Sequence, residues 1–154
     1  MIGLMKQILL RCIGAFAGTL GYAFILNAPL ITVMPASLTG LVGYLIYELL
    51  LNFTGVGVLF SYFIATVLIS VACEFEARVM RMPSTIFLMT ALVPLIPGGG
   101  LYYTMTNAIS GDVIGFIERG LKTISLAVAL ALGVIVVTVM MNIINKVKKL
   151  PKRQ

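Results

Sequence analysis

The sequence predicts an all-α integral membrane protein, and three observations on composition and pattern support this fold class. The chain has 154 residues, of which 60% are hydrophobic and only 10% are charged, against roughly 25% charged in an ordinary soluble domain. Its mean hydropathy is +1.11. The apolar residues gather into long segments that match the ~20 residues needed to cross a bilayer as a helix. A soluble enzyme, a disordered chain and a disulfide-rich module are excluded, and the lipid bilayer is the expected surrounding.

Five transmembrane helices are expected, and no soluble domain fits in the remaining sequence. The predicted spans cover residues 4–26, 36–51, 55–73, 84–109 and 121–144. The second is the shortest. A four-span alternative that omits it places more of the basic residues on one side of the membrane, as the positive-inside rule favours. Five spans are preferred because the polar stripe that ends at Glu48 suits a buried helix. We therefore expect one transmembrane helical domain over residues 1–154.

The basic residues are concentrated at the C-terminus. Five of the eleven lysines and arginines lie in the tail formed by residues 146–154, directly after an apolar run. Such a tail is typical of a cytoplasmic segment beside anionic lipid. The sequence therefore predicts a multi-pass protein of the cell membrane with a cytoplasmic C-terminus. No basic patch is interleaved with aromatic residues, so nucleic acid is not an expected partner.

Residues for enzymatic chemistry are scarce. The chain has no histidine and five acidic residues, and Cys12 and Cys73 lie in or beside apolar stretches. Neither a metal site nor a nucleophile with its base is predicted. The phosphate-binding pattern G-x-x-x-x-G-K-[ST] is missing from the sequence, so ATP hydrolysis by this chain is not expected. We predict no catalytic residues and no cofactor.

The most informative segment interrupts the fourth predicted span. Pro94 and Pro97 remove two backbone donors, and Gly98, Gly99 and Gly100 follow at once. Prolines disfavour helix at and before their positions, and glycines leave the backbone bare. About ten apolar residues flank the break on each side, so it should lie near the middle of the bilayer.

A helix broken at this depth leaves polar backbone groups that lipid cannot satisfy. The amides of the glycines begin the second half-helix and would attract a carboxylate, while the carbonyls that end the first half would attract an ammonium group. Transporters build substrate sites in this way. Tyr102, Tyr103 and Asn107 follow within the next turns and complete the predicted binding site. The alternative is a proline kink satisfied by neighbouring helices.

Two acidic residues are candidates for coupling transport to an ion. Glu48 shares a helical stripe with small and aromatic residues, so it should face the interior, although its position near a helix end would also let it reach the interface. Asp112 lies between two glycines in a short loop and could line the exit or only form a turn. Glu74 and Glu76, beside arginines, are expected to lie in water at a helix end.

The broken segment also resembles a known family. Residues 92–102 read Leu-Val-Pro-Leu-Ile-Pro-Gly-Gly-Gly-Leu-Tyr, which is similar to the signature of the short subunit of the threonine/serine exporter family. Residues 21–29, Gly-Tyr-Ala-Phe-Ile-Leu-Asn-Ala-Pro, and the basic link with Arg78 and Arg81 before Pro83 also resemble that family. The likeness covers essentially the whole chain. It implies a small inner-membrane protein that works with a longer, related membrane subunit.

The expected function is therefore that of a secondary transporter subunit that exports small carboxylated metabolites, with threonine and serine as the first choice. The resemblance also implies dicarboxylate (succinate) export as an alternative. A structural subunit whose partner holds the substrate site, and a channel, remain competing hypotheses. Too few helices are present to enclose an aqueous path comfortably, so we expect a homo-oligomer or a hetero-oligomer.

Overall fold

The computed structural model describes residues 2–149, and every regular element in that part of the chain is a helix. The last residues of the predicted basic tail, 150–154, lie outside the described range. The elements are α1 (Ile2–Ile25), α2 (Leu30–Phe53), α3 (Val58–Met80), α4 (Ser84–Ala91), the 3-10 turn η1 (Val93–Leu95), α5 (Gly98–Ile109) and α6 (Val113–Lys149). The predicted all-α class is confirmed for the described residues.

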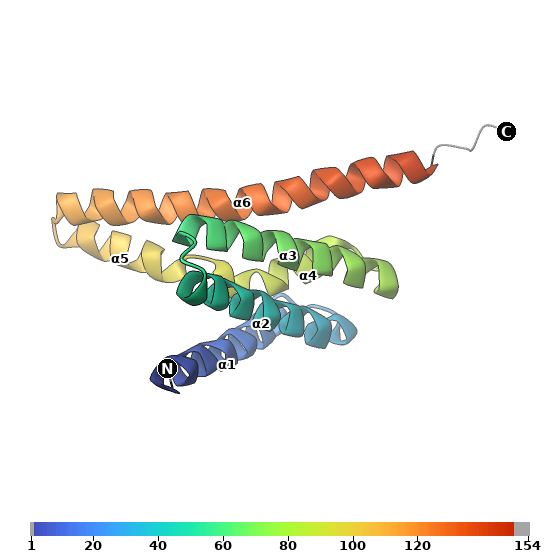
Figure 1. The fold of residues 1–154 in the computed structure, drawn as a ribbon, viewed down its shortest axis with the longest axis horizontal. Coiled ribbons are helices and arrows are strands. Elements are labelled where there is room, and N and C mark those ends of the chain that lie inside the picture. The colour runs from blue at the N-terminus through green and yellow to red at the C-terminus, as the bar shows by residue number, and fades with distance from the viewer. Residues whose placement is uncertain (1, 150–154) are drawn as a thin grey trace.

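Four helices are long and apolar enough to cross a membrane, and the bent pair formed by α4 with η1 and α5 makes a fifth candidate. Successive passes run in opposite directions, so the two ends of the chain lie at opposite ends of the bundle (Figure 1). The second predicted span is a full-length helix of 24 residues rather than the shortest one. This arrangement agrees with the five-span prediction and makes the protein a multi-pass membrane protein.

Three helices extend beyond their predicted bounds. α2 begins at Leu30 and contains Pro35, whose missing N–H costs one bond of the helical ladder without ending the helix. α3 continues to Met80, well past the predicted end. α6 has 37 residues, about 55 Å at 1.5 Å per residue. The apolar pattern marks only the part of α6 that crosses hydrocarbon, whereas charged residues that favour helix extend it at both ends.

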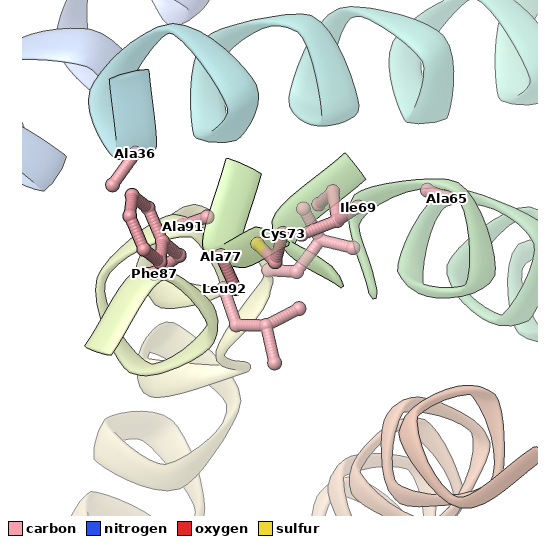
Figure 2. Packing of buried hydrophobic residues seen from close by; sticks show 9 residues of the cluster. Ala36, Ala65, Ile69, Cys73, Ala77, Phe87, Ala91 and Leu92 are labelled. Atoms are coloured by element: carbon pink, nitrogen blue, oxygen red, sulfur yellow. The ribbon is translucent and has the colours of Figure 1, made fainter. Parts of the chain in front are cut away.

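The core lies between α2, α3 and the α4–η1 segment. Ala36 of α2 is directed at Phe87 and Ala91 of α4 (Figure 2). On the other side of this contact, α3 contributes a row of small and medium residues. The cluster consists of Ala36, Ala65, Ile69, Cys73, Ala77, Phe87, Ala91, Leu92 and Leu95. The first half of the broken span is therefore held inside the bundle, while α5 packs mainly against α6 and projects with it (Figure 1).

Glycines set how closely the helices approach. A Cβ atom at Gly43 of α2 would overlap the side chain of Ile69 of α3, which is buried. At Gly133 of α6 a Cβ atom would lie 2.8 Å from the Cβ of Thr66 of α3. A Cβ atom at Gly40 of α2 would lie 3.0 Å from the carbonyl oxygen of Ala91 in α4. Because association in lipid depends on close packing rather than on the hydrophobic effect, these contacts stabilise the bundle.

The α2–α3 contact can be tested by filling Gly43. We expect Gly43→Val to lower the free energy of unfolding in detergent by about 1–3 kcal/mol, because the new side chain overlaps Ile69 in a packed site. Gly14→Val is the matched control, since no atom lies within 4 Å of a Cβ at that position. Thermal unfolding of the two purified variants measures the difference, and equal stability would contradict the close approach.

Candidate functional site

A polar cavity of about 570 Å³ lies at the break in the fourth span. The start of α5 forms one wall, the first turns of α6 form another, and Tyr62 of α3 closes a third side. The lining residues are Tyr62, Ile96, Pro97, Gly98, Gly99, Gly100, Tyr103, Glu118, Arg119, Lys122, Thr123 and Leu126. Of the predicted binding residues, Pro97, the three glycines and Tyr103 therefore lie together.

The other predicted binding residues do not line the cavity. Pro94 lies within η1, on the bundle side of the break. Tyr102 packs edge-on against Tyr103 with 5.4 Å between ring centroids, but it is exposed elsewhere. Asn107 lies at the turn between α5 and α6, where its backbone carbonyl accepts a hydrogen bond from the amide of Asp112 at 3.0 Å. Consecutive helical residues point about 100° apart, so only one of the two tyrosines can face the cavity.

The break has a different structure on its two sides. The chain bends by 41° between α4 and the segment formed by η1 and α5. On the first side, the carbonyl of Leu92 accepts a bond from Leu95 at 2.9 Å and that of Val93 accepts one from Ile96 at 3.2 Å. The expectation covered the carbonyls from about Thr90 to Val93. For Leu92 and Val93 it is wrong that they stay free for an ammonium group, because the 3-10 turn uses them.

On the second side, amides stay free. The amide of Gly98 donates to Ile96 at 2.7 Å and that of Leu101 donates to Pro97 at 3.1 Å. Within the described residues, the amides of Gly99 and Gly100 make no hydrogen bond. They begin a helix of 12 residues at the cavity wall. The positive end of the helix dipole and two unused donors together favour a negatively charged group there.

α6 contributes three charged residues that the sequence analysis did not assign to the site. Glu118, Arg119 and Lys122 line the cavity beside the glycines. The guanidinium carbon of Arg119 lies 5.3 Å from the ring centroid of Tyr103, a cation–π distance. The spacing of the three charged residues along α6 puts them on one helical face, and this pattern could have been recognised in the sequence. Only the packing of α5 on α6, however, brings this face to the break.

Glu48 is buried in an ion pair. Its side chain is 1% exposed, and its Oε1 accepts a bond from Nη1 of Arg11 in α1 at 3.0 Å. The hydroxyl of Tyr44 donates to the same oxygen at 3.0 Å, and the amide of Asn52 donates to Oε2 at 3.1 Å. The predicted inward orientation of Glu48 is confirmed. Arg11, with a side chain 59% exposed, links this carboxylate to the outer side of α1.

A row of tyrosines connects Glu48 with the cavity. Tyr62, in the cavity wall, packs edge-on against Tyr47 with 4.8 Å between centroids. Tyr47 lies 5.7 Å from Tyr44, whose hydroxyl donates to Glu48. The stripe that the sequence placed on one face of the second span therefore leads from the ion pair to the site.

Asp112 forms the start of α6. Its Oδ1 accepts a bond from the amide of Gly115 at 3.0 Å, which is the role of a helix-capping carboxylate. Asp112 does not line the cavity at the break. This geometry agrees with the turn interpretation of Asp112, and its role in coupling stays a prediction.

Glu76 differs from the expectation of a water-exposed helix end. One oxygen of its carboxyl group bonds to the hydroxyl of Thr39 of α2. The other, Oε2, is buried and has no hydrogen-bond partner. The physical reason is that α3 continues to Met80, so that Glu76 lies against α2 rather than beyond the end of the helix.

The apolar helical bundle has a broken span, and unbonded amides and charged residues line one cavity at the break, which is how helical membrane transporters build substrate sites. Comparison with known protein families then identifies the family. Residues 11–140 match the model of the family described as Threonine/Serine exporter, ThrE, and the chain belongs to this family. No solved structure matches the chain.

The α5–α6 contact makes a prediction about Gly100. A Cβ atom there would lie 2.5 Å from Oγ1 of Thr123, so Gly100→Ala should destabilise the hairpin by about 1–3 kcal/mol. Adding Thr123→Ala should restore most of this loss. Gly98→Ala serves as control, because no atom lies within 4 Å of that position. Thermal unfolding of all three variants provides the test; a double variant no more stable than Gly100→Ala would contradict it.

Proposed function

We propose that this chain is a subunit of a secondary transporter that exports threonine and serine, and that its substrate binds at the break between η1 and α5. The observation that carries the proposal is the pair of unused amides of Gly99 and Gly100 in the cavity wall. Family membership supports an exporter of the threonine/serine type. The substrate carboxylate would accept bonds from these two amides, as anions do at helix N-termini.

The remaining groups of the cavity suit the rest of an amino acid. Glu118 forms no salt bridge within residues 2–149 and lines the cavity, so it supplies the acceptor for an ammonium group that the carbonyls of η1 do not supply. The hydroxyl of Tyr103 makes no hydrogen bond to other described residues and is available to the substrate hydroxyl. The carboxylate of the zwitterion then meets amide donors, and its ammonium group meets the carboxylate of Glu118.

Dicarboxylate export is the second candidate, because the cavity also contains two cations. Arg119 and Lys122 lie beside the glycine amides and would hold a second carboxylate. Lys122→Gln separates the two candidates. If the substrate is a dicarboxylate, this variant should raise KM for succinate strongly, whereas for threonine the loss of a second cation should have a small effect.

A partner chain is part of the proposal. The charged lining residues Glu118, Arg119 and Lys122 are exposed on α6, and charged residues facing lipid are costly. Gly14 and Gly18 of α1 also lie on an exposed face that permits close helix contact. We propose that a longer related membrane subunit, or a second copy of this chain, covers these surfaces. Purification as an active monomer would contradict this part.

We further propose that the protein resides in the cell membrane with its C-terminus in the cytoplasm. Nη2 of Arg78, near the end of α3, donates to Oδ1 of Asn145 near the end of α6 at 3.2 Å. Arg78, Arg81 and Lys146, which follows Asn145, therefore lie towards the same end of the bundle. A gathering of basic residues at one end supports a cytoplasmic side there by the positive-inside rule. A reporter fused to the C-terminus and found active only outside the cytoplasm would overturn the assignment.

Counterflow tests the function as a whole. Proteoliposomes loaded with unlabelled threonine or serine should accumulate the labelled amino acid against its gradient, with activity depending on the chain. A chain that adds nothing to the activity of its partner would be a structural subunit. Labelled substrate that only equilibrates, without transient accumulation, would indicate a channel.

The role of the free amides predicts the effect of covering them. Gly99→Val should reduce counterflow to near background, because a branched side chain at the start of α5 blocks approach to the amides. No atom lies within 4 Å of a Cβ at Gly98 or Gly99, so expression and unfolding temperature should stay close to those of the parent. Gly98→Val should act in the same way. Normal transport by well-folded valine variants would show that the break has only a structural role.

Glu48 is proposed as a coupling acid, because the tyrosine row connects it with the cavity. Glu48→Gln should slow transport and flatten its dependence on pH, whereas Glu74→Gln should keep the parental profile. The single variant also leaves Arg11 without its partner, which lowers stability. A double variant with Arg11→Gln and Glu48→Gln should regain stability without regaining the pH dependence. Initial rates across a pH series distinguish these outcomes, and a parental profile in Glu48→Gln would exclude this role.

A further inference from the structure

The carboxyl group of Glu76 occupies an unusual position between α2 and α3. Its Oε1 and the hydroxyl of Thr39 form a hydrogen bond. Its Oε2 is buried and has no hydrogen-bond partner among the described residues. Most buried polar atoms in folded proteins have a partner, so an exception requires an explanation.

Among the described side chains, no cationic group forms a salt bridge with this carboxyl group. Within residues 2–149 the only salt bridge joins Arg11 to Glu48. Arg78, two residues further along α3, bonds instead to Asn145 and to the sulfur of Met141 on α6. Glu76 therefore lacks both a cation and a second donor.

The surrounding helices offer few other titratable groups. α4 contains none. On α2 they are Tyr44, Tyr47 and Glu48, which belong to the ion pair and the tyrosine row. α6 has charged residues only towards its two ends. On α3 itself, the nearest such residues along the helix are Cys73, Glu74 and Arg78.

Glu76 as a whole is half-buried, but its Oε2 atom is buried and has no partner. A carboxylate oxygen in such a position is costly, because the charge needs donors on both oxygens or a cation nearby. A carboxylic acid is satisfied more easily. In this structure the hydroxyl of Thr39 donates to Oε1. Because a hydroxyl can rotate, protonation of Glu76 on Oε1 would reverse this bond: the acid O–H would donate to the oxygen of Thr39, and Oε2 would remain as a neutral carbonyl oxygen. We propose that Glu76 is a proton-binding group of the bundle, which carries a proton in this conformation and releases it when the α2–α3 contact at Thr39 opens to water.

This site is separate from the Glu48 site. Thr39 precedes Glu48 by nine residues on α2, about 14 Å along the helix axis. Glu48 has donors on both oxygens and an ion pair with Arg11, whereas Glu76 has one hydroxyl partner and no salt bridge. The two acids therefore differ in the partners that surround them.

Infrared difference spectroscopy of the full chain in lipid tests the proton directly and needs no transport. We expect a carbonyl band of a protonated carboxylic acid near neutral pH that disappears in Glu76→Gln and persists in Glu74→Gln. Thr39→Val should shift the position of this band, because the acid loses its hydrogen-bond partner. A spectrum in which Glu76→Gln changes only carboxylate bands, or in which Thr39→Val shifts nothing, would overturn the proposal.

A hydrophobic carbodiimide gives an independent readout, since this reagent reacts with protonated carboxyl groups in apolar surroundings. Mass spectrometry should find the adduct at Glu76 and not at Glu74, and labelling should fall as the pH rises. Labelling of Glu74 alone would contradict the assignment.

The transport consequence rests on the proposed function. The export rate of Glu76→Gln should lose its dependence on the pH gradient, while Glu74→Gln keeps it. If the chain proves not to transport threonine or serine, the infrared and labelling results still decide whether Glu76 holds a proton. A parental pH profile in Glu76→Gln would show that this proton is not used in transport.

Discussion

Hydrocarbon offers no hydrogen-bond partner to a peptide group, and most features of this protein follow from that constraint. Every regular element of residues 2–149 is helical because a helix satisfies its own backbone. At the break in the fourth span, the two sides differ in how their backbone groups are satisfied. The carbonyls of Leu92 and Val93 accept hydrogen bonds within the 3-10 turn η1, whereas the amides of Gly99 and Gly100 have no partner among residues 2–149. Unsatisfied donors are tolerated in a membrane protein where they face a polar cavity, and here they do.

The packing of the helices determines where the break lies in the bundle. Small residues let α2 and α3 approach closely around α4, so the first half of the broken span is fixed in the core (Figure 2). The second half leaves the core and pairs with α6 (Figure 1). The first half, α4, therefore packs against several helices, whereas the second half, α5, packs mainly against α6. α6 is itself packed along α3, with Gly133 against Thr66, so α5 is joined to the core mainly through α6.

Three acidic residues show how different surroundings give similar side chains different roles. Glu48 lies among three donors, one of them a guanidinium, and the tyrosine row joins it to the cavity. Asp112 caps α6 through the amide of Gly115. Glu76 has one hydroxyl partner and no cation. The residue type is nearly the same in each case, but an ion-paired carboxyl group, a helix cap and a carboxyl group with one hydroxyl partner have different surroundings and therefore suit different roles.

The sequence alone determined the membrane class, the five segments, the break at Pro94–Gly100 and the inward face of Glu48. Hydropathy and helical periodicity are local properties, and prolines and glycines act on their own backbone, so these features needed no knowledge of neighbours. The tertiary structure decided the rest. Glu118, Arg119 and Lys122 became part of the site only because α5 packs on α6, and Arg11 met Glu48 only because α1 packs on α2. Glu76 was misjudged for the same reason: burial depends on which helices pack around a residue, and the pattern along one helix does not contain that information.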